Sequence, residues 1–319
     1  MTVLVTGGAG FIGSHFVGHL LASDADARIV CLDDFNAYYA PAAKRANVAS
    51  FAANPRVTIV EGSITDVTLI RRVMNEHGVR RIVHLAAYAG VRSSGSMPLV
   101  YEETNVRGTL VLLEAARSEL LESFVLVSSS TVYGAGAAVP FQEDAPLGVP
   151  LSLYGITKRS AELMGLHYQA VHGLPVVCLR PFSVYGPRIR PDLAMWIFAD
   201  AILRERPIPI LGDGSARRDF THVSDICHGI HAAMVAVDVA GKAINLGHHA
   251  PIGMLELVRL LEAELGRPAT IEWLPAFSGD LPITCADLTK AARLLDYHPR
   301  VSIEEGVADF ARWFRQQNK

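Results

Sequence analysis

The stretch that decides the fold is Thr2-Val3-Leu4-Val5-Thr6-Gly7-Gly8-Ala9-Gly10-Phe11-Ile12-Gly13. Its first five residues form a short β-rich run, and apolar residues then recur at helical spacing from Phe11 to Leu21. The glycines therefore join a strand to a helix. Gly7, Gly10 and Gly13 permit a tight turn and let phosphates approach the helix N-terminus. The spacing is a variant of the dinucleotide-binding fingerprint.

A second expected strand, Arg28 to Leu32, ends in two acids, Asp33 and Asp34, and Asp33 lies 20 residues beyond Gly13. An acid at this place can accept both ribose hydroxyls of an adenosine and repels a 2′-phosphate, so NAD is favoured over NADP. A helix cap is the alternative role for Asp33. The glycine turn before it favours ribose binding.

Strands and helices alternate through the first half of the chain. We expect strands at 57–60, 81–85 and 124–127, and helices at 67–77 and about 99–118. This alternation predicts an α/β fold with a doubly wound parallel (Rossmann) sheet, whose ligands bind beyond the carboxyl ends of the strands. Those ends hold Gly62-Ser63-Ile64, Leu85-Ala86-Ala87, Ser128-Ser129-Ser130 and Arg180-Pro181-Phe182-Ser183. Asn105, inside the long helix, is either a satisfied core amide or a cofactor contact.

The alternation becomes less regular after Val184, where prolines punctuate the chain. Helical patterns at 193–203, 254–265 and 303–314 are separated by expected strands at 208–211, 243–246 and 270–274. We predict an NAD-binding domain formed by residues 1–182 with about 219–249. Residues 183–218 and about 250–319 would form a smaller mixed α/β domain that binds the substrate.

Composition narrows the class of protein. Half of the 319 residues are hydrophobic, and 29 basic against 32 acidic residues give a net charge of −3, so neither nucleic acid nor a membrane is an expected partner. The N-terminal residues lack a basic segment, so no signal peptide is expected. Four widely spaced cysteines indicate reduced thiols in a cytoplasmic protein. The pairs His15/His19 and His228/His231 have helical ligand spacing, but no third ligand is expected near either, so no metal site is predicted.

Tyr154 and Lys158 lie four residues apart on an expected helix that begins near Leu153. They are therefore about 40° apart around the helix axis and about 6 Å apart along it, so both can face one pocket. An ammonium beside a phenol favours the phenolate and lowers its pKa, which makes the tyrosine a candidate base. The alternative is a buried aromatic residue with a solvated lysine one turn later.

Several motifs together resemble the extended short-chain dehydrogenases/reductases, the family of NAD-dependent sugar-nucleotide epimerases and dehydratases. They are Thr6-Gly7-Gly8-Ala9-Gly10-Phe11-Ile12-Gly13-Ser14, Ser128-Ser129-Ser130-Thr131-Val132-Tyr133-Gly134, Tyr154 with Lys158, Arg217-Arg218-Asp219-Phe220, and Gly279-Asp280-Leu281-Pro282. A narrower likeness to UDP-glucuronate 4-epimerases is carried by Asp33-Asp34-Phe35-Asn36-Ala37-Tyr38-Tyr39, Ala89-Gly90-Val91-Arg92-Ser93, and Gly186-Pro187-Arg188-Ile189-Arg190-Pro191-Asp192-Leu193.

The resemblance implies roles for individual residues. Tyr154 would take the proton of the sugar 4-hydroxyl, Lys158 would hold the nicotinamide ribose, and Ser129 would hydrogen-bond the same hydroxyl. The implied cofactor contacts are Gly7, Gly10, Phe11, Ile12, Gly13, Asp33, Asp34, Asn36, Ser63, Ile64, Leu85, Ala86, Ala87, Asn105, Tyr154 and Lys158. The implied substrate contacts are Arg92, Ser129, Ser130, Ser183, Arg190, Arg218 and Asp280, the last two at the UDP moiety.

Three positions depart from the family pattern. Ser63 stands where an aspartate usually reads the adenine amino group, which weakens that contact. Ser183 stands where the glucuronate enzymes usually have threonine. Phe277 stands where glucose-type epimerases place a diphosphate-binding arginine, which leaves more of that contact to Arg218.

The expected reaction is epimerisation at C4 through transient oxidation, in which NAD takes the C4 hydride and returns it to the other face of a 4-keto sugar. With UDP-glucuronate as substrate this intermediate is a β-keto acid that can lose carbon dioxide. Arg190 is the expected holder of the carboxylate, because guanidinium binds carboxylates in a bidentate manner, with Ser183 as a second donor. A solvated loop arginine is the alternative.

Other functions remain open at this level. UDP-glucose 4-epimerisation and glucuronate decarboxylation share most of the residues. A 4,6-dehydratase is disfavoured, because Ser130 and Thr131 stand where an Asp-Glu pair would be. An NAD-sensing binding protein would have little need of Tyr154, Lys158 and Ser129 together. The resemblance also implies a homodimer, in which the helix after Met97 and the Tyr154 helix pair across a two-fold axis.

Overall fold

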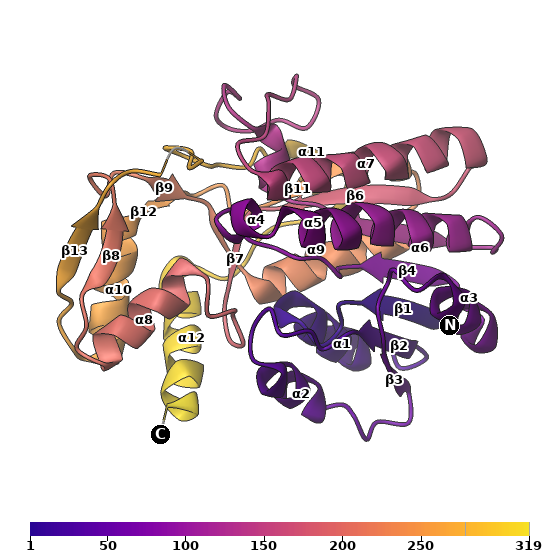
Figure 1. Cartoon of the computed structure of the whole chain (residues 1–319), viewed down its shortest axis with the longest axis horizontal. Coiled ribbons are helices and arrows are strands. Elements are labelled where there is room, and N and C mark those ends of the chain that lie inside the picture. Colours follow the sequence, from indigo (N-terminus) through magenta and orange to yellow (C-terminus); the bar gives the residue numbers. More distant parts are fainter. Residues whose placement is uncertain (278, 319) are drawn as a thin grey trace.

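The computed structural model describes residues 1–277 and 279–318 and is built around a seven-stranded parallel sheet (Figure 1). The strand order is β3-β2-β1-β4-β5-β6-β11. The strands are β1 (Thr2–Thr6), β2 (Arg28–Asp33), β3 (Val57–Glu61), β4 (Arg81–His84), β5 (Ser123–Val127), β6 (Val176–Pro181) and β11 (Ala243–Leu246). This confirms the predicted fold class, a doubly wound parallel sheet.

Both faces of the sheet are buried, because side chains alternate between two apolar clusters. Val3 and Val5 of β1 face one cluster, and Leu4 faces the other. The first cluster is covered by helices α1 (Phe11–Ser23), α2 (Pro41–Ala49) and α9 (Val223–Val235). The second is covered by α3 (Val67–His77), α6 (Thr109–Ala116) and α7 (Leu153–His172).

The strand order places the site. β1 pairs with β2 on one side and with β4 on the other, so the chain reverses its direction of travel across the sheet between β1 and β4. Turns that leave neighbouring strands at such a point diverge and leave a crevice at the carboxyl ends. The glycine turn after β1 and the segment after β4 border this crevice.

The C-terminal part packs beside that edge as small sheets with helices, away from most of the large sheet (Figure 1). Its strand pairs are β7 (Ser183–Tyr185) with β10 (Phe220–His222), β9 (Arg217–Arg218) with β12 (Ile252–Gly253), and β8 (Ile208–Leu211) with β13 (Ile271–Leu274). Its helices are α8 (Ala194–Leu203), α10 (Met254–Leu265) and α12 (Ile303–Gln317), whereas α11 (Thr289–Leu295) packs against α9 and against β11 of the large sheet. β11 returns to pair with β6. The domain boundaries inferred from the sequence remain a prediction.

The expected helix at about 99–118 is not a regular α-helix throughout. After α4 (Ser93–Ser96), the chain forms α5 (Pro98–Glu102), a π-helical turn (Glu103–Gly108) and α6. Gly108 in that turn lies against Ile64, where a Cβ would come within 2.5 Å of the isoleucine side chain. The wider turn displaces Asn105 from regular helical register, and such deviations are frequent at functional sites. The apolar pattern gave no sign of it.

The remaining short elements were not predicted from the sequence. β7, β9, β10 and β12 have two or three residues each, which is too short for an apolar period to be visible. A 3₁₀ turn, Ser130–Tyr133, follows the serines after β5. Within residues 1–277 and 279–318, no helix combines the length and apolar character needed to cross a membrane.

Candidate active site

A cavity of about 720 Å³ lies beyond the carboxyl ends of the central strands, between the sheet and the C-terminal part. Its size is within the usual range of small-molecule sites. The predicted site residues that line it are Gly7, Gly10, Phe11, Ile12, Gly13, Asp33, Asp34, Asn36, Ile64, Leu85, Ala86, Ala87, Arg92, Ser129, Ser130, Tyr154, Lys158, Ser183, Arg190, Arg218 and Asp280. The fold therefore brings almost the whole predicted set into one space.

The glycine turn has the shape that a pyrophosphate requires. Gly7 has φ +71°, and a Cβ on it would lie 2.7 Å from the Ala86 nitrogen. A Cβ on Gly13 would lie 2.1 Å from the Gly7 carbonyl oxygen. Gly10 precedes the first residue of α1 and has no side chain to cap the helix. The backbone N–H groups of the first turn of α1 are therefore open to an anion in the cavity.

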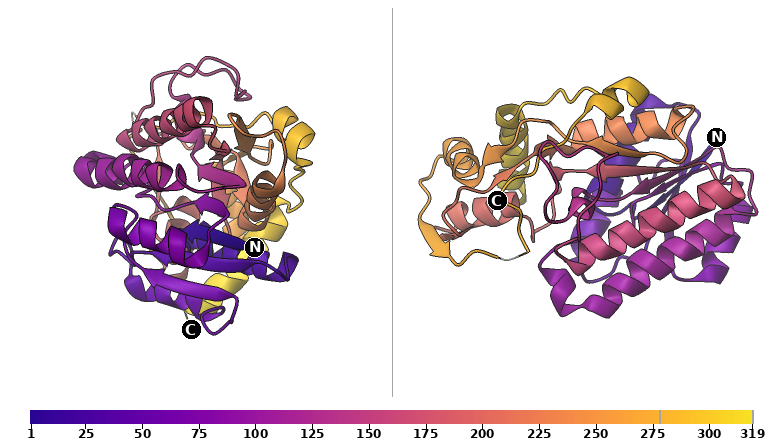
Figure 2. Two further views of the ribbon diagram at one scale, coloured as in Figure 1. Left: turned by 90° about the vertical axis from the view of Figure 1, so that its right-hand side faces the viewer. Right: turned by 90° about the horizontal axis from the view of Figure 1, so that it is seen from above.

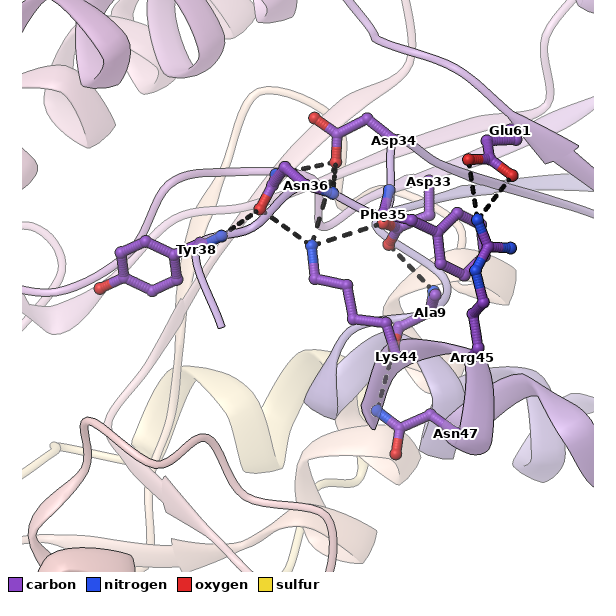
Figure 3. Close-up of polar contacts among 10 residues, drawn as sticks. All are labelled: Ala9, Asp33, Asp34, Phe35, Asn36, Tyr38, Lys44, Arg45, Asn47 and Glu61. Carbon is purple, nitrogen blue, oxygen red and sulfur yellow. Dashed lines mark hydrogen bonds and ion pairs between the residues drawn. The ribbon is translucent and has the colours of Figure 1, made fainter. Parts of the chain in front are cut away.

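Asp33 is buried at the end of β2 with both carboxylate oxygens engaged (Figure 3). Oδ2 accepts from the Ala9 nitrogen at 3.1 Å, and Oδ1 accepts from the Phe35 nitrogen at 2.9 Å. Burial raises the pKa of Asp33, and the nearby Lys44 ammonium opposes that rise. Each oxygen keeps a lone pair for a ribose hydroxyl, so the carboxylate fits the role predicted for it.

Lys44 is a cavity residue that the sequence analysis missed. Only 5% of the residue is exposed. Its ammonium lies 3.7 Å from Asp33 and 3.9 Å from Asp34, and it donates to Asn36 Oδ1 at 3.0 Å. Figure 3 shows it reaching from α2 to the loop after β2. Nothing local marks this lysine, because only the packing of α2 brings it to the acids.

Tyr154 and Lys158 lie in the first turns of α7. Ser152 caps the N-terminus of this helix by accepting a hydrogen bond from the Gly155 nitrogen. Burial raises the pKa of the Tyr154 phenol, while the Arg190 charge and a hydrogen bond from Ser129 lower it. Lys158 is buried, donates to the Val127 carbonyl at 2.7 Å, and burial lowers its pKa to about 8. The lysine therefore remains largely protonated at pH 7 and the phenol keeps its proton.

Ser129 reaches the cavity from the turn after β5. Its hydroxyl oxygen accepts from the Thr131 nitrogen at 3.2 Å and from Thr131 Oγ1 at 3.0 Å. These two donors fix the serine oxygen at the N-terminus of the 3₁₀ turn. The hydroxyl proton of Ser129 is then free to be shared with Tyr154 or with a ligand.

The substrate end of the cavity carries two arginines, each paired with an acid of the same region. Arg190 Nε and Nη2 donate to the two oxygens of Asp192 at 2.9 and 3.0 Å. Arg218 Nη2 lies 2.8 Å from Asp280 Oδ1. The guanidinium of Arg190 acts on the pKa of Tyr154, so it belongs to the same electrostatic site as the candidate base.

Two predicted cofactor contacts, Ser63 and Asn105, do not line the cavity among the described residues, and their contact with the cofactor stays a prediction. Ser63 does not line the cavity, because its hydroxyl turns back to Thr65, accepting from the nitrogen at 3.2 Å and pairing with Oγ1 at 2.9 Å. Asn105 is 1% exposed and lies behind the cavity wall. Its amide accepts from the Tyr88 nitrogen at 2.8 Å and donates to the Tyr88 carbonyl and to Thr157 Oγ1.

The structure shows Asn105 as a satisfied amide, the first of its two predicted roles. It ties the segment after β4, which lines the cavity, to the helix that carries the tyrosine. Thr157 extends the link by donating to the Tyr154 carbonyl at 3.0 Å. The residue positions the cavity wall without forming part of it.

The two histidine pairs meet in the structure. Helices α1 and α9 pack together, so His19 Nε2 lies 3.0 Å from His231 Nδ1, and its ring lies 4.9 Å from that of His228. Burial lowers the pKa of His19 to about 4. The rings meet edge to face, and no group of three possible ligands within the described residues is arranged to hold a metal ion.

The fold, the glycine turn, the acid after β2 and the Tyr-Lys pair define a member of the extended short-chain dehydrogenases/reductases. The model of the NAD dependent epimerase/dehydratase family matches residues 3–247. The chain belongs to that family.

Relatives with known names span the whole chain. A UDP-glucuronate 4-epimerase of Thermodesulfobacterium geofontis is 36% identical over 314 residues, which cover 98% of this chain and 96% of the relative. The crystal structure of UDP-glucuronic acid 4-epimerase from Bacillus cereus with UDP-glucuronic acid and NAD has a TM-score of 0.95 at 35% identity, covering 99% and 100% of the two chains. A dTDP-glucose 4,6-dehydratase from Streptomyces venezuelae with NAD and TYD bound has a TM-score of 0.93 at 34% identity, covering 100% and 98%.

Proposed function

We propose that the protein is an NAD-dependent 4-epimerase of UDP-sugars that converts UDP-glucuronate to UDP-galacturonate through a 4-keto intermediate. The observation that carries the proposal is the presence of Arg190 in the same cavity as Tyr154, Lys158 and Ser129. Arg190 provides a cation that can bind a carboxylate. Tyr154 provides the acid–base group, and Lys158 and Ser129 are its partners. The similarity to UDP-glucuronate 4-epimerases supports the same substrate.

The cofactor would be held by groups that the structure already places around the cavity. The glycine turn and the first turn of α1 would hold the pyrophosphate, and Asp33 would hold the adenosine ribose, with Lys44 keeping the acid oriented. Lys158 would donate to the nicotinamide ribose. When bound, NAD supplies a reversible hydride acceptor for the sugar C4.

Tyr154 would remove the proton from the sugar 4-hydroxyl and later return it. Burial raises the pKa of the phenol in the cofactor-free protein, so it holds its proton until positive charge collects around it. Arg190 provides part of that charge in the structure, and Lys158 and oxidised nicotinamide would provide the rest. Ser129 would hydrogen-bond the reacting oxygen and keep it aligned with the phenol.

The remaining predicted substrate contacts are divided between the two ends of the sugar nucleotide. Arg218 and Asp280 would contact UDP, and Arg92, Ser130 and Ser183 would contact the sugar. Arg190 would hold the sugar carboxylate as an anion. Loss of carbon dioxide from a β-keto acid is suppressed when the carboxylate is held in an orientation that disfavours cleavage, so this contact would also protect the intermediate.

Replacement of Arg190 by alanine tests the assignment of the substrate. Removing one partner of a desolvated ion pair typically costs 2–5 kcal/mol, so kcat/KM for UDP-glucuronate should fall by at least about thirtyfold. Turnover of UDP-glucose should fall less, because it loses only the effect of the Arg190 charge on the pKa of Tyr154. Arg217→Ala, an arginine of the same region that does not line the cavity, is the matched control. Equal losses on the two sugars in Arg190→Ala would overturn the glucuronate assignment.

A homodimer is part of the same proposal. Helices α5 to α7 lie side by side along one flank of the molecule (Figure 2). Their exposed apolar residues are Leu99, Val100, Leu110, Leu153, Ile156, Leu163 and Val171. A second copy would cover this surface as a four-helix bundle.

Light scattering should give about twice the 34.5 kDa mass of the chain. Leu163→Lys should lower it, and the control Val237→Lys, at an exposed valine in the segment after α9, should not. A monomeric wild type would contradict the proposal.

A cytoplasmic location is also proposed. The four cysteines are all unpaired and buried, each within the described residues. Free thiols persist in reducing compartments. Fluorescence microscopy of the tagged protein in its own cells is the direct test.

A further inference from the structure

The guanidinium that would receive the sugar carboxylate is already occupied by a carboxylate of the chain. Arg190 Nε donates to Asp192 Oδ1 at 2.9 Å, and Nη2 donates to Oδ2 at 3.0 Å. This is the bidentate arrangement in which arginine binds a carboxylate most strongly. Only Nη1 of the guanidinium remains outside the pair.

The pair is built into the cavity wall. Both side chains line the cavity, with 19% of Arg190 and 36% of Asp192 exposed. The one residue between them is Pro191, whose ring fixes its own φ angle and so restricts the backbone between the two side chains. Tyr38 closes the other side, with its hydroxyl 3.2 Å from Asp192 Oδ2 and its ring centroid 5.7 Å from the Arg190 guanidinium carbon.

Tyr38 is itself fixed, so the pair has a defined position relative to the segment after β4. The Tyr38 hydroxyl donates to the Ala89 carbonyl and lies 2.9 Å from Ser93 Oγ. The pair is therefore held between two loops that border the cavity.

We propose that Asp192 is a positioning residue that shares Arg190 with the carboxylate of the substrate and takes the arginine back when that carboxylate leaves. This inference rests on the proposed function. Two carboxylates on one guanidinium repel each other, so Asp192 weakens the hold on the substrate carboxylate. The arginine is nevertheless never left as an unpaired cation in a partly desolvated site.

The inferred role has a reason in the geometry of 4-epimerisation. A 4-keto sugar must present its other face to the same hydride donor, so the ring turns over and its carboxylate changes place. A carboxylate gripped by an uncontested arginine would be released slowly. Asp192 lowers the free energy of release by providing a replacement partner, and thereby exchanges tightness of binding for speed of turnover.

The test compares Asp192→Asn with the wild type, both loaded with NAD, on UDP-glucuronate and on UDP-glucose. The asparagine side chain keeps the shape and loses the competing charge. UDP-glucuronate should bind at least threefold more tightly by calorimetry, and its kcat should fall at least threefold. The Kd of UDP-glucose should change less than twofold. Asp192→Glu, which keeps a carboxylate on the same loop, should show smaller changes in both quantities for UDP-glucuronate.

The outcomes separate this inference from the proposed function. If the wild type turns over no UDP-glucuronate, the proposed function fails, and the two Kd values still test the competition for Arg190. Weaker binding of UDP-glucuronate by Asp192→Asn would mean that Asp192 only supports Arg190 and would overturn the inference. A lower kcat with unchanged Kd would overturn it as well.

Discussion

Replacing Lys158 with methionine should change how the stability of the protein depends on pH. Burial lowers the pKa of the Lys158 ammonium from 10.5 to about 8 in the folded protein. Between these values the unfolded chain binds more protons at this lysine than the folded chain does. The free energy of unfolding of the wild type therefore gains a contribution that rises with pH, and the methionine variant lacks it.

The magnitude follows from the difference between the two pKa values. At 1.36 kcal/mol per pKa unit the full contribution is about 3 kcal/mol, and about 2.5 kcal/mol of it accrues between pH 7 and pH 10. Methionine also removes the hydrogen bond from Nζ to the Val127 carbonyl. That loss is similar at every pH, so only the change in the difference between wild type and variant reports the buried charge.

Urea denaturation followed by tryptophan fluorescence at pH 7, 8, 9 and 10 measures this difference. From pH 7 to pH 10, the free energy of unfolding of the wild type should rise by about 2.5 kcal/mol relative to that of Lys158→Met. Lys242→Met, which removes a lysine from a surface turn, controls for effects common to any lysine and should show no such trend. Parallel stability curves for wild type and Lys158→Met would refute the reasoning and, with it, the view that this lysine is held as a buried cation.

Three further predictions concern single side chains. Glu162→Gln should destabilise the fold by about 3 kcal/mol in urea denaturation, because it leaves the buried Arg180 guanidinium without its counter-charge. Arg180 Nε and Nη2 now donate to the Glu162 carboxylate at 2.9 and 2.8 Å. A loss below about 1 kcal/mol would contradict this. Gly13→Ala should lower NAD affinity at least tenfold by calorimetry, since its Cβ has no room in the turn, whereas Gly18→Ala in the same helix, where the structure shows open space among the described residues, should leave affinity unchanged. Burial lowers the pKa of His84 to about 3, so the wild type should lose about 2 kcal/mol relative to His84→Gln between pH 7.5 and pH 5, as the unfolded chain takes up the proton, and a constant difference would refute the assignment.

The fold could be predicted from the sequence because the signals for its strands and helices are local and repeated. The glycine turn lies between a strand and a helix, and strands β2 to β6 end in or just before residues that line the cavity. The same locality explains the exact agreement for α10 and the near agreement for α8 and α12. The π-helical turn at 103–108 was not predicted, because it changes only the backbone hydrogen bonding of the helix and leaves no mark in the apolar pattern.

The site was predictable where a motif fixes the residue and unpredictable where packing does. Tyr154, Lys158 and Ser129 were predicted from their motifs and lie together in the cavity. Lys44 was missed because a lysine on a short helix ordinarily faces solvent, and only the approach of α2 buries it beside Asp33. Asp192 lies two residues from Arg190, and its bidentate pairing with that arginine could have been suspected from the Arg-Pro-Asp sequence alone.

Proton NMR of the NAD-loaded protein with UDP-glucuronate in D₂O tests the central claim most directly. A 4-epimerase that returns the hydride it has taken should form UDP-galacturonate that keeps protium at C4, because that hydrogen never exchanges with solvent. Tyr154→Phe should form it far more slowly. Deuterium at C4 of the product, a decarboxylated pentose nucleotide, or no product from the wild type would each contradict the account.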